Sequence, residues 1–219
     1  MQNYGVTAHG VTLSQRQLDF AKEKVKRLGL EDKITLELRD YATLEDGGYN
    51  KISSIGMYEH VGIANYPNYF RKIRDLLVDG GIVLNHGITR RARLDKKQQN
   101  KIKPARKLIL KYIFPGSELD NVGHTVEVME GCNLEVHDVE GWREHYGLTA
   151  MYWARNLMAN KEKAIELVGK EKFRMWIAYI IGVSCGFSDG TMKIYQVVAS
   201  KNDKKGPSGL PLTRADLYR

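Results

Sequence analysis

Strand-like runs alternate with helical segments through the first third of the chain, and this alternation limits the fold more than any other feature. Residues 6–13 are short and β-branched, and Ser14 can cap a helix whose apolar positions follow a helical period. Residues 33–38, 49–55 and 82–84 are typical of strands, and residues 65–77 of a helix. This order predicts an α/β fold with a mostly parallel sheet and right-handed crossovers.

The second half predicts further elements of the same domain. Residues 89–111 are basic and helix-prone, and they predict a helical insertion that extends to about residue 130. Strands are expected at 134–139 and 192–200, with two or more helices over 142–171 and 173–187. The polar tail 201–219 contains Gly and Pro and is expected to be flexible, which leaves residues 1–200 as one domain.

Composition excludes several classes of protein. With 219 residues, 42% hydrophobic and 27% charged, the chain has the balance of one globular domain. Its longest uncharged apolar stretch, residues 176–187, is short of the roughly 20 residues that a membrane span needs. Cys132 and Cys185 are too few for a disulfide framework or a metal cluster, so no metal is expected. Residues 1–20 show no secretory signal, and we expect a cytoplasmic protein.

Two segments combine polar residues with strand ends. The turn from Gly10 to Ser14 lies where doubly wound sheets bind nucleotides, although an ordinary capped helix start explains it equally. In residues 53–62 an apolar strand runs directly into Glu59, His60 and a glycine. A catalytic pair at the crevice and a chance surface pair both fit this second pattern.

Six motifs occur here in the order found in cyclopropane fatty acid and mycolic acid cyclopropane synthases. They are Thr12-Leu13-Ser14, Asp40-Tyr41, Ser54-Ile55-Gly56-Met57-Tyr58-Glu59-His60-Val61-Gly62, Leu84-Asn85-His86-Gly87-Ile88, Ile113-Phe114-Pro115-Gly116 and His145-Tyr146. Each motif is weak alone, but their order and spacing are specific. The chain therefore resembles this S-adenosylmethionine-dependent family over nearly its whole length, which implies a Rossmann-like class I methyltransferase fold.

The resemblance also implies two sets of site residues. A bicarbonate ion would be held by Glu59, His86, Tyr146 and the backbone amide of Ile88. The family adds a cysteine from an upstream segment, to which neither cysteine here corresponds. For S-adenosylmethionine, the implied residues are Thr12, Leu13 and Gln17 at the methionine and ribose end, Tyr41 and Ala42 at the adenine, and His60 at the rim.

The implied reaction is that of a cyclopropane-fatty-acyl-phospholipid synthase, which transfers a methylene group from S-adenosylmethionine to a cis double bond of an unsaturated phospholipid. The intermediate is a carbocation, which bicarbonate deprotonates. Rings such as Tyr58, Tyr152 or Trp153 can stabilise that cation, although for each ring taken singly plain core packing is the favoured explanation.

One family feature is missing, because no G-x-G-x-G pattern occurs in the sequence. The first, central strand and its glycine-rich loop are therefore expected to be absent. The isolated chain is expected to bind S-adenosylmethionine weakly or not at all, and to be inactive unless an N-terminal fragment or a second copy completes the sheet.

Alternative functions stay open. A small-amine methyltransferase shares the fold, but His86 and the Phe114-Pro115-Gly116 segment favour the lipid enzymes; a product with a branched acyl chain shares the same cation. A non-catalytic basic module is the remaining alternative, since residues 90–111 contain ten Lys or Arg and one acid. Without a nucleic-acid motif, we expect this segment to dock on an anionic membrane, at its inner surface, rather than on nucleic acid.

Overall fold

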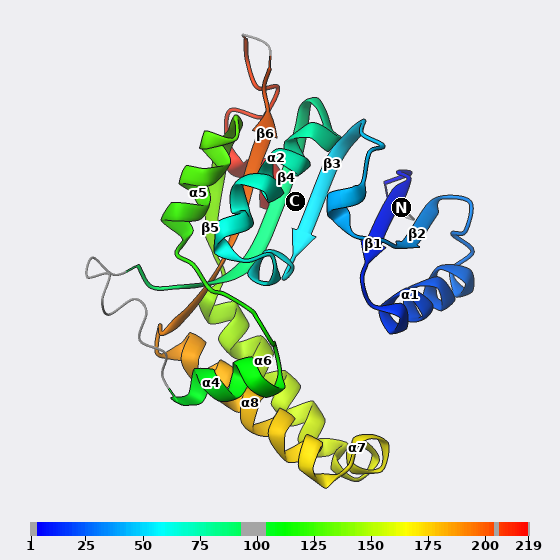
Figure 1. Cartoon of the computed structure of the whole chain (residues 1–219), viewed down its shortest axis with the longest axis vertical. Helices are drawn as coiled ribbons and strands as arrows, with labels where there is room; N and C mark the ends of the chain where they lie inside the picture. The colour runs from blue at the N-terminus through cyan, green and yellow to red at the C-terminus, as the bar shows by residue number, and fades with distance from the viewer. Residues whose placement is uncertain (1–3, 93–103, 204–205, 219) are drawn as a thin grey trace. The chain divides into compact units, whose positions relative to one another are not determined.

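The computed structural model describes residues 4–92, 104–203 and 206–218 and divides the chain into two compact units, Met1–Gly48 and Tyr49–Arg219 (Figure 1). Each unit has its own sheet. Of the four strand ladders among the described residues, β1–β2 and β3–β4 are parallel, and β4–β6 and β5–β6 are antiparallel. The expected α/β architecture is present, with the antiparallel pairs added by the C-terminal half.

The first unit is a β-α-β element. Strand β1 (Ala8–Thr12) pairs with β2 (Ile34–Leu38), and helix α1 (Gln15–Arg27) connects them. Ser14 caps α1 as predicted, because its side chain accepts a hydrogen bond from the Gln17 backbone N–H. Gly29 follows the helix with φ of +60°, a conformation that favours glycine.

The second unit contains a four-stranded sheet in the order β3-β4-β6-β5. Its strands are β3 (Tyr49–Ile55), β4 (Leu77–Arg90), β5 (Leu134–Gly141) and β6 (Met192–Lys201). Strand β4 is longer than the strand predicted at residues 82–84. It begins at Leu77 and includes Asp79-Gly80-Gly81, a sequence that is typical of a turn. The register of β4 against β3 shifts there, and Gly80 takes a φ of +73°.

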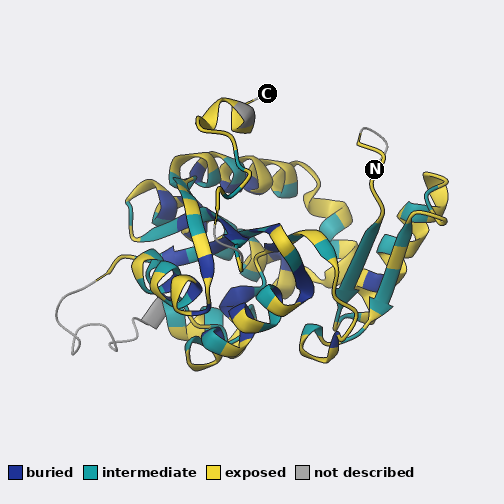
Figure 2. Ribbon diagram, turned by 90° about the horizontal axis from the view of Figure 1, so that it is seen from above, coloured by how far each residue is buried: buried dark blue, intermediate teal, exposed yellow. Residues whose placement is uncertain are grey.

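Helices cover one face of this sheet through buried aromatic residues. Helix α2 (Tyr66–Leu76) packs with α5 (Val122–Gly131) on the side of Asn85 and Gly87. The Tyr69 hydroxyl donates to Ser54 Oγ at 2.6 Å and lies 3.1 Å from Asn85 Oδ1. Figure 2 shows buried residues concentrated on the strands and on the helix faces that contact them.

The opposite face of the sheet carries His86 and Ile88, since alternate residues of a strand face opposite sides. Helices α6 (Arg143–Ala159) and α8 (Lys170–Ser188) pack as a pair, with α7 (Lys161–Val168) between them in the chain. Their core with β6 consists of Ala150, Val183, Phe187 and Ile194. No helix among the described residues is long and apolar enough to cross a bilayer.

The basic segment falls partly outside the described residues. Arg93, Lys96, Lys97, Lys101 and Lys103 all lie there. The described part contains helix α4 (Pro104–Tyr112), after which Phe114 contacts Tyr179 of α8 edge-on, with ring centroids 5.8 Å apart.

The C-terminal tail has specific contacts with strand β5. It ends in a short 3-10 helix, η4 (Arg214–Tyr218). Arg214 Nε lies 2.6 Å from Asp138 Oδ2, and the Tyr218 hydroxyl donates to Glu140 Oε1 at 3.0 Å.

Candidate active site

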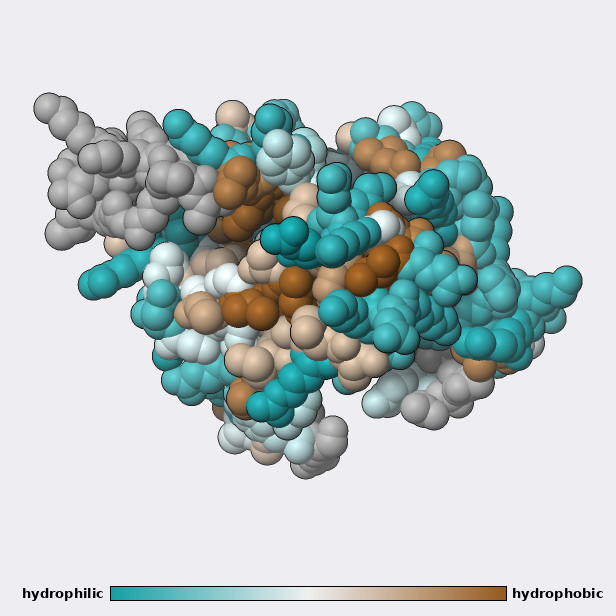
Figure 3. All heavy atoms as spheres, turned by 90° about the horizontal axis from the view of Figure 1, so that it is seen from below, coloured by the Kyte–Doolittle hydropathy of each residue, from teal (hydrophilic) through white to brown (hydrophobic). Residues whose placement is uncertain are grey.

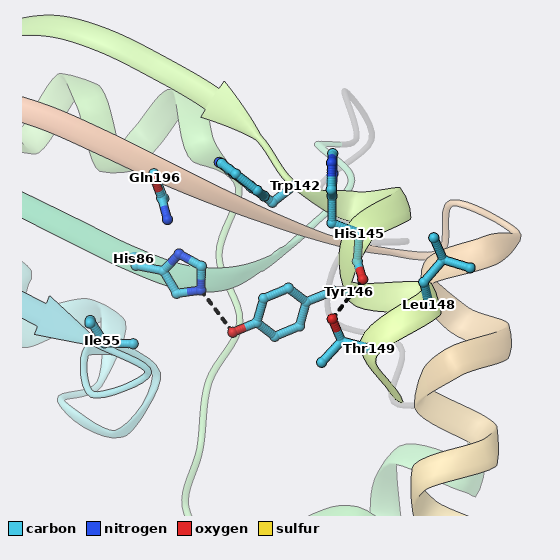
Figure 4. A pocket seen from close by; sticks show the side chains of 8 residues that line it. All are labelled: Ile55, His86, Trp142, His145, Tyr146, Leu148, Thr149 and Gln196. Atoms are coloured by element: carbon cyan, nitrogen blue, oxygen red, sulfur yellow. Dashed lines mark hydrogen bonds between the residues drawn. The ribbon is translucent and has the colours of Figure 1, made fainter. Parts of the chain in front are cut away.

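A cavity of about 490 Å³ opens at the face of the sheet that carries His86 (Figure 4). Three of its residues, Ile55, His86 and Gln196, are register partners on the adjacent strands β3, β4 and β6. The first turns of α6 and the residue before it complete the wall with Trp142, His145, Tyr146, Leu148 and Thr149. Because Ile55 is the last residue of the parallel strand β3, the cavity lies at a carboxyl end, where α/β sheets bind ligands.

His86 and Tyr146 meet inside this cavity. His86 Nε2 lies 3.0 Å from the Tyr146 hydroxyl oxygen, and the ring centroids are 5.4 Å apart. Burial lowers the pKa of His86, so the imidazole is neutral near pH 7. Burial, followed by the charge of Glu59, raises the pKa of Tyr146. This phenol therefore keeps its proton and can donate a hydrogen bond.

Glu59 lies beside the same strand, in the 3-10 helix η2 (Tyr58–His60) that follows β3. Its side chain is buried, and Oε1 accepts a hydrogen bond from the Ile88 backbone N–H at 2.7 Å. Oε2 is buried and has no partner. Burial raises the pKa of Glu59, despite the opposing effect of the Ile88 hydrogen bond. A carboxyl group in this environment favours its protonated, neutral form.

The amide of Ile88 differs from what the resemblance implies. The family pattern assigns this N–H to bicarbonate, but here it donates to Glu59. The physical reason is local: η2 brings the buried carboxyl within hydrogen-bonding distance of β4, and a buried N–H needs an acceptor. Ile88 thus links Glu59 to the strand that carries His86.

Tyr58 and Gly87 fix this arrangement from the other face of the sheet. Tyr58 is 1% exposed, and its hydroxyl lies 3.4 Å from the Ile88 carbonyl oxygen, near the limit for a hydrogen bond. Its ring lies directly against the backbone of Gly87, where no side chain fits. Tyr58 therefore packs against strand β4 on the face opposite the cavity. Because it does not line the cavity, a role in stabilising a cation there is not supported.

These residues fit a small anion. The Tyr146 hydroxyl is a hydrogen-bond donor, and Glu59, whose pKa is raised by burial, is a second donor whenever its carboxyl carries a proton; its Oε2 has no partner. A neutral Glu59 also avoids repulsion between two negative groups. The structure thus pairs His86 with Tyr146 and attaches Glu59 to the same strand through Ile88; that all three hold one anion stays a prediction.

The residues predicted for S-adenosylmethionine fall into two groups. In the first unit, the Thr12 hydroxyl donates to Gln17 Oε1 at 2.8 Å, and the Thr12 carbonyl accepts from the Arg39 N–H. This second bond joins the end of β1 to Arg39, which lies between β2 and the 3-10 helix η1 (Tyr41–Thr43) that contains Tyr41 and Ala42.

The other two cofactor residues differ in exposure and in place. Leu13 is 75% exposed. His60 belongs to the second unit, is exposed, and contacts Phe114 edge-on at 5.5 Å between centroids.

Sequence reasoning missed four cavity residues, Trp142, Leu148, Thr149 and Gln196. Trp142 precedes α6, and its indole N–H is buried without a partner. Gln196 faces the cavity only because β6 pairs antiparallel with β4. Trp142 could have been predicted as a site residue because it lies three residues before the His145-Tyr146 motif. No neighbouring sequence motif indicates that Gln196 belongs to the site.

Comparisons with known proteins identify the family. The family model for mycolic acid cyclopropane synthetase matches residues 1–197. A "Probable fatty acid methyltransferase" of Pseudomonas putida is 37% identical over 219 residues, which are 100% of this chain and 55% of the relative. The "Probable fatty acid methyltransferase Rv3720" of Mycobacterium tuberculosis is 33% identical over 208 residues, which are 95% of this chain and 47% of the relative. The chain thus spans about half the length of these curated relatives.

Solved structures show the same fold. The cyclopropane synthase MmaA2 from Mycobacterium tuberculosis has a TM-score of 0.83 and 23% identity. The mycolic acid cyclopropane synthase CmaA1, complexed with SAH and CTAB, has a TM-score of 0.82 and 26% identity. Each comparison covers 91% of this chain and 72% of the other. The fold is therefore that of class I S-adenosylmethionine-dependent methyltransferases.

Proposed function

Because the chain belongs to the mycolic acid cyclopropane synthetase family, we propose that it forms the catalytic part of an S-adenosylmethionine-dependent enzyme that alkylates a cis double bond of a phospholipid acyl chain. One observation carries the proposal: His86 and Tyr146 meet in one cavity, and the strand that carries His86 also binds, through the Ile88 N–H, the buried carboxyl of Glu59, whose Oε2 has no partner. A neutral His86 and a neutral Glu59 suit a site that holds an anion next to a developing cation.

The chemistry requires a base beside a cation. When bound, S-adenosylmethionine supplies the sulfonium methyl group, which the π electrons of the double bond attack while the sulfur keeps the electron pair of the broken bond. The resulting carbocation closes to a cyclopropane ring after the new methyl group loses a proton. Glu59 and Tyr146 would hold a bicarbonate ion, which would supply the base for that proton.

The side chains have distinct parts in this scheme. Tyr146 donates a hydrogen bond toward the anion position, and the neutral Glu59 donates through the carboxyl oxygen that is not engaged by Ile88. His86 orients the Tyr146 hydroxyl. Trp142 and Leu148 form an apolar part of the wall, which limits the access of water to the cation.

A branched product is the second candidate. The Pseudomonas putida relative carries the name fatty acid methyltransferase, and another relative, 29% identical, is named "Tuberculostearic acid methyltransferase UfaA1". Ring and branch share the same first step and differ in the fate of the carbocation. Mass spectrometry and proton NMR of the product lipid separate them, because only the ring product shows cyclopropane protons.

The lipid substrate makes peripheral association with an anionic, inner membrane surface part of the proposal. Helix α4 contributes Arg106, Lys107 and Lys111, next to the exposed side chains Leu108 and Tyr112. Figure 3 shows apolar side chains gathered on the face seen from below and bordered by hydrophilic ones. Basic and apolar groups together favour an anionic lipid surface. Leu94 and Ile102, also expected to face the acyl layer, lie outside the described residues.

A methyl-transfer assay with the intact protein tests the function. The assay supplies methyl-labelled S-adenosylmethionine, vesicles of unsaturated phospholipid, and buffer with or without bicarbonate. We expect label in the acyl chains, less label without bicarbonate, and a large loss of kcat in Tyr146→Phe. The matched control is Tyr152→Phe, because Tyr152 lies on the exposed side of the same helix. Label in an amine, or no transfer to lipid, would contradict the proposal.

A further inference from the structure

Gln196 is the cross-strand neighbour of His86. The antiparallel register of β4 and β6 places the two residues directly opposite each other, and both line the cavity. Cβ atoms of such pairs lie about 4.5–5.5 Å apart, within reach of a glutamine side chain. Figure 4 shows the nitrogen end of the Gln196 carboxamide directed toward the His86 ring.

The Nδ1 atom of His86 lacks a hydrogen-bond partner. Its Nε2 atom faces Tyr146, whereas its Nδ1 atom is buried and has no hydrogen-bond partner. A buried ring nitrogen without a partner is unfavourable. The carboxamide of Gln196 lines the same cavity opposite His86, and it contains both donors and an acceptor.

The anion position decides which tautomer of His86 is useful. If Nδ1 carried the proton, Nε2 would accept from the Tyr146 hydroxyl, and Tyr146 would present only lone pairs to the anion. If Nε2 carries the proton, it donates to the Tyr146 oxygen and leaves the Tyr146 hydroxyl proton free for the anion. Only the second tautomer makes an anion site.

We infer that Gln196 is a positioning residue, which selects the Nε2–H tautomer of His86 by donating a hydrogen bond from its carboxamide nitrogen to Nδ1. The inference rests on the anion site proposed above. It describes one polarised chain of donors: Gln196 to His86, His86 to Tyr146, and Tyr146 to the anion. Such chains strengthen the terminal donor.

Nitrogen-15 NMR of the histidine-labelled chain tests the tautomer without any turnover. The His86 signals are assigned by their loss in His86→Gln. We expect the Nε2–H form in the wild type. Gln196→Met removes the donor at similar volume, and the tautomer ratio should shift about fivefold toward Nδ1–H, the effect of one neutral hydrogen bond. Gln196→Glu can only accept from Nδ1, so it should reverse the preference.

The control is Lys193→Gln on the same strand, whose side chain is outside the cavity and should leave the His86 signals unchanged. Thermal unfolding establishes that each variant is folded. A wild-type Nδ1–H form, or the same tautomer in wild type, Gln196→Met and Gln196→Glu, overturns the inference. In the intact protein, Gln196→Met should lower kcat more than it changes the KM for lipid. If the tautomer changes as expected in the variants but no methyl transfer is found, the result contradicts the proposed function and leaves the role of Gln196 in selecting the tautomer supported.

Discussion

Tyr58 lies so close to the backbone of Gly87 that a Cβ atom on Gly87 would sit 2.0 Å from Tyr58 Cε1. Tyr58 is fully buried and stacks on Tyr66, with ring centroids 5.3 Å apart, so it has little room to move. The residues on either side of Gly87 are His86 and Ile88, which both belong to the candidate site.

We therefore expect Gly87→Ala to destabilise the protein by about 1–3 kcal/mol, because overpacking forces the ring or the strand to shift. Chemical denaturation measures the change. Gly182→Ala on helix α8 is the matched control, since its Cβ would meet no atom within 4 Å and alanine favours a helix. Equal effects of the two substitutions would show that the contact between Tyr58 and Gly87 is unimportant.

Glu59→Gln should be well tolerated, because a carboxamide oxygen can still accept from the Ile88 N–H and the side chain stays neutral. The wild-type pKa is raised by burial, so the native state holds its proton more tightly than the unfolded chain does. This contribution to stability is present below the unfolded pKa, near 4.5, and is lost as the pH rises through the folded value.

The stability of Glu59→Gln relative to wild type should thus increase with pH above about 4.5, in denaturation series measured at several pH values. Glu59→Ala is the contrasting variant. It leaves the Ile88 N–H without its acceptor and should cost about 1–3 kcal/mol. A constant difference between Glu59→Gln and wild type at every pH would contradict the buried, neutral carboxyl.

His86 should give the opposite pH dependence. Its pKa is lowered by burial, so the unfolded chain binds a proton more readily than the native state. Stability should fall as the pH drops through about 6.5, the usual histidine value, toward the lower folded value. His86→Gln should lose this part of the dependence of stability on pH. The check is the difference between the two proteins in denaturant midpoint from pH 8 to pH 5.

Removal of Lys107 and Lys111 should weaken binding to anionic vesicles by about 1 kcal/mol for each charge at low salt. Sedimentation with vesicles of anionic and neutral phospholipid measures it. Lys22→Gln with Lys24→Gln, on exposed positions of α1, removes the same charge elsewhere and should have a smaller effect. Equal binding to neutral vesicles would remove the electrostatic basis of the proposal.

Arg214→Ala should release the C-terminal tail with little change in global stability. Arg214 is more than half exposed, and exposed ion pairs contribute only about 0–1 kcal/mol. We expect Arg214→Ala to be cleaved faster than wild type at sites after residue 203, with the same denaturation midpoint. If the tail is cleaved at the same rate in both proteins, the contacts with Asp138 and Glu140 do not hold it.

Local signals in the sequence predicted much of the fold. Ser14 and Gly29 mark the ends of α1, because capping and a left-handed turn are properties of single residues. The start of β4 was missed, since Asp79-Gly80-Gly81 predicts a turn whether or not the flanking residues pair with β3. That pairing depends on a neighbouring strand, not on the turn.

The candidate site was predictable to a similar extent. Glu59, His86 and Tyr146 were named through the resemblance; the structure pairs His86 with Tyr146 and binds Glu59 to Ile88 on the strand of His86, and their joint role stays a prediction. The hydrogen bond from Ile88 to Glu59 and the position of Gln196 depend on tertiary contacts that no motif encodes. The cofactor residues of the first unit, and the expected absence of a central strand, stay predictions.

The pairing of β4 with β6 also has a consequence for how the protein matures. His86 acquires its cross-strand neighbour only after residue 196 has been synthesised, long after His86 itself. Until β6 docks, the cavity lacks one wall, and the imidazole is exposed to water on that side. A ribosome-bound or C-terminally clipped chain therefore contains every residue of the anion site without the environment that gives those residues their protonation states. The site residues therefore reach their final environment only when β6 pairs with β4.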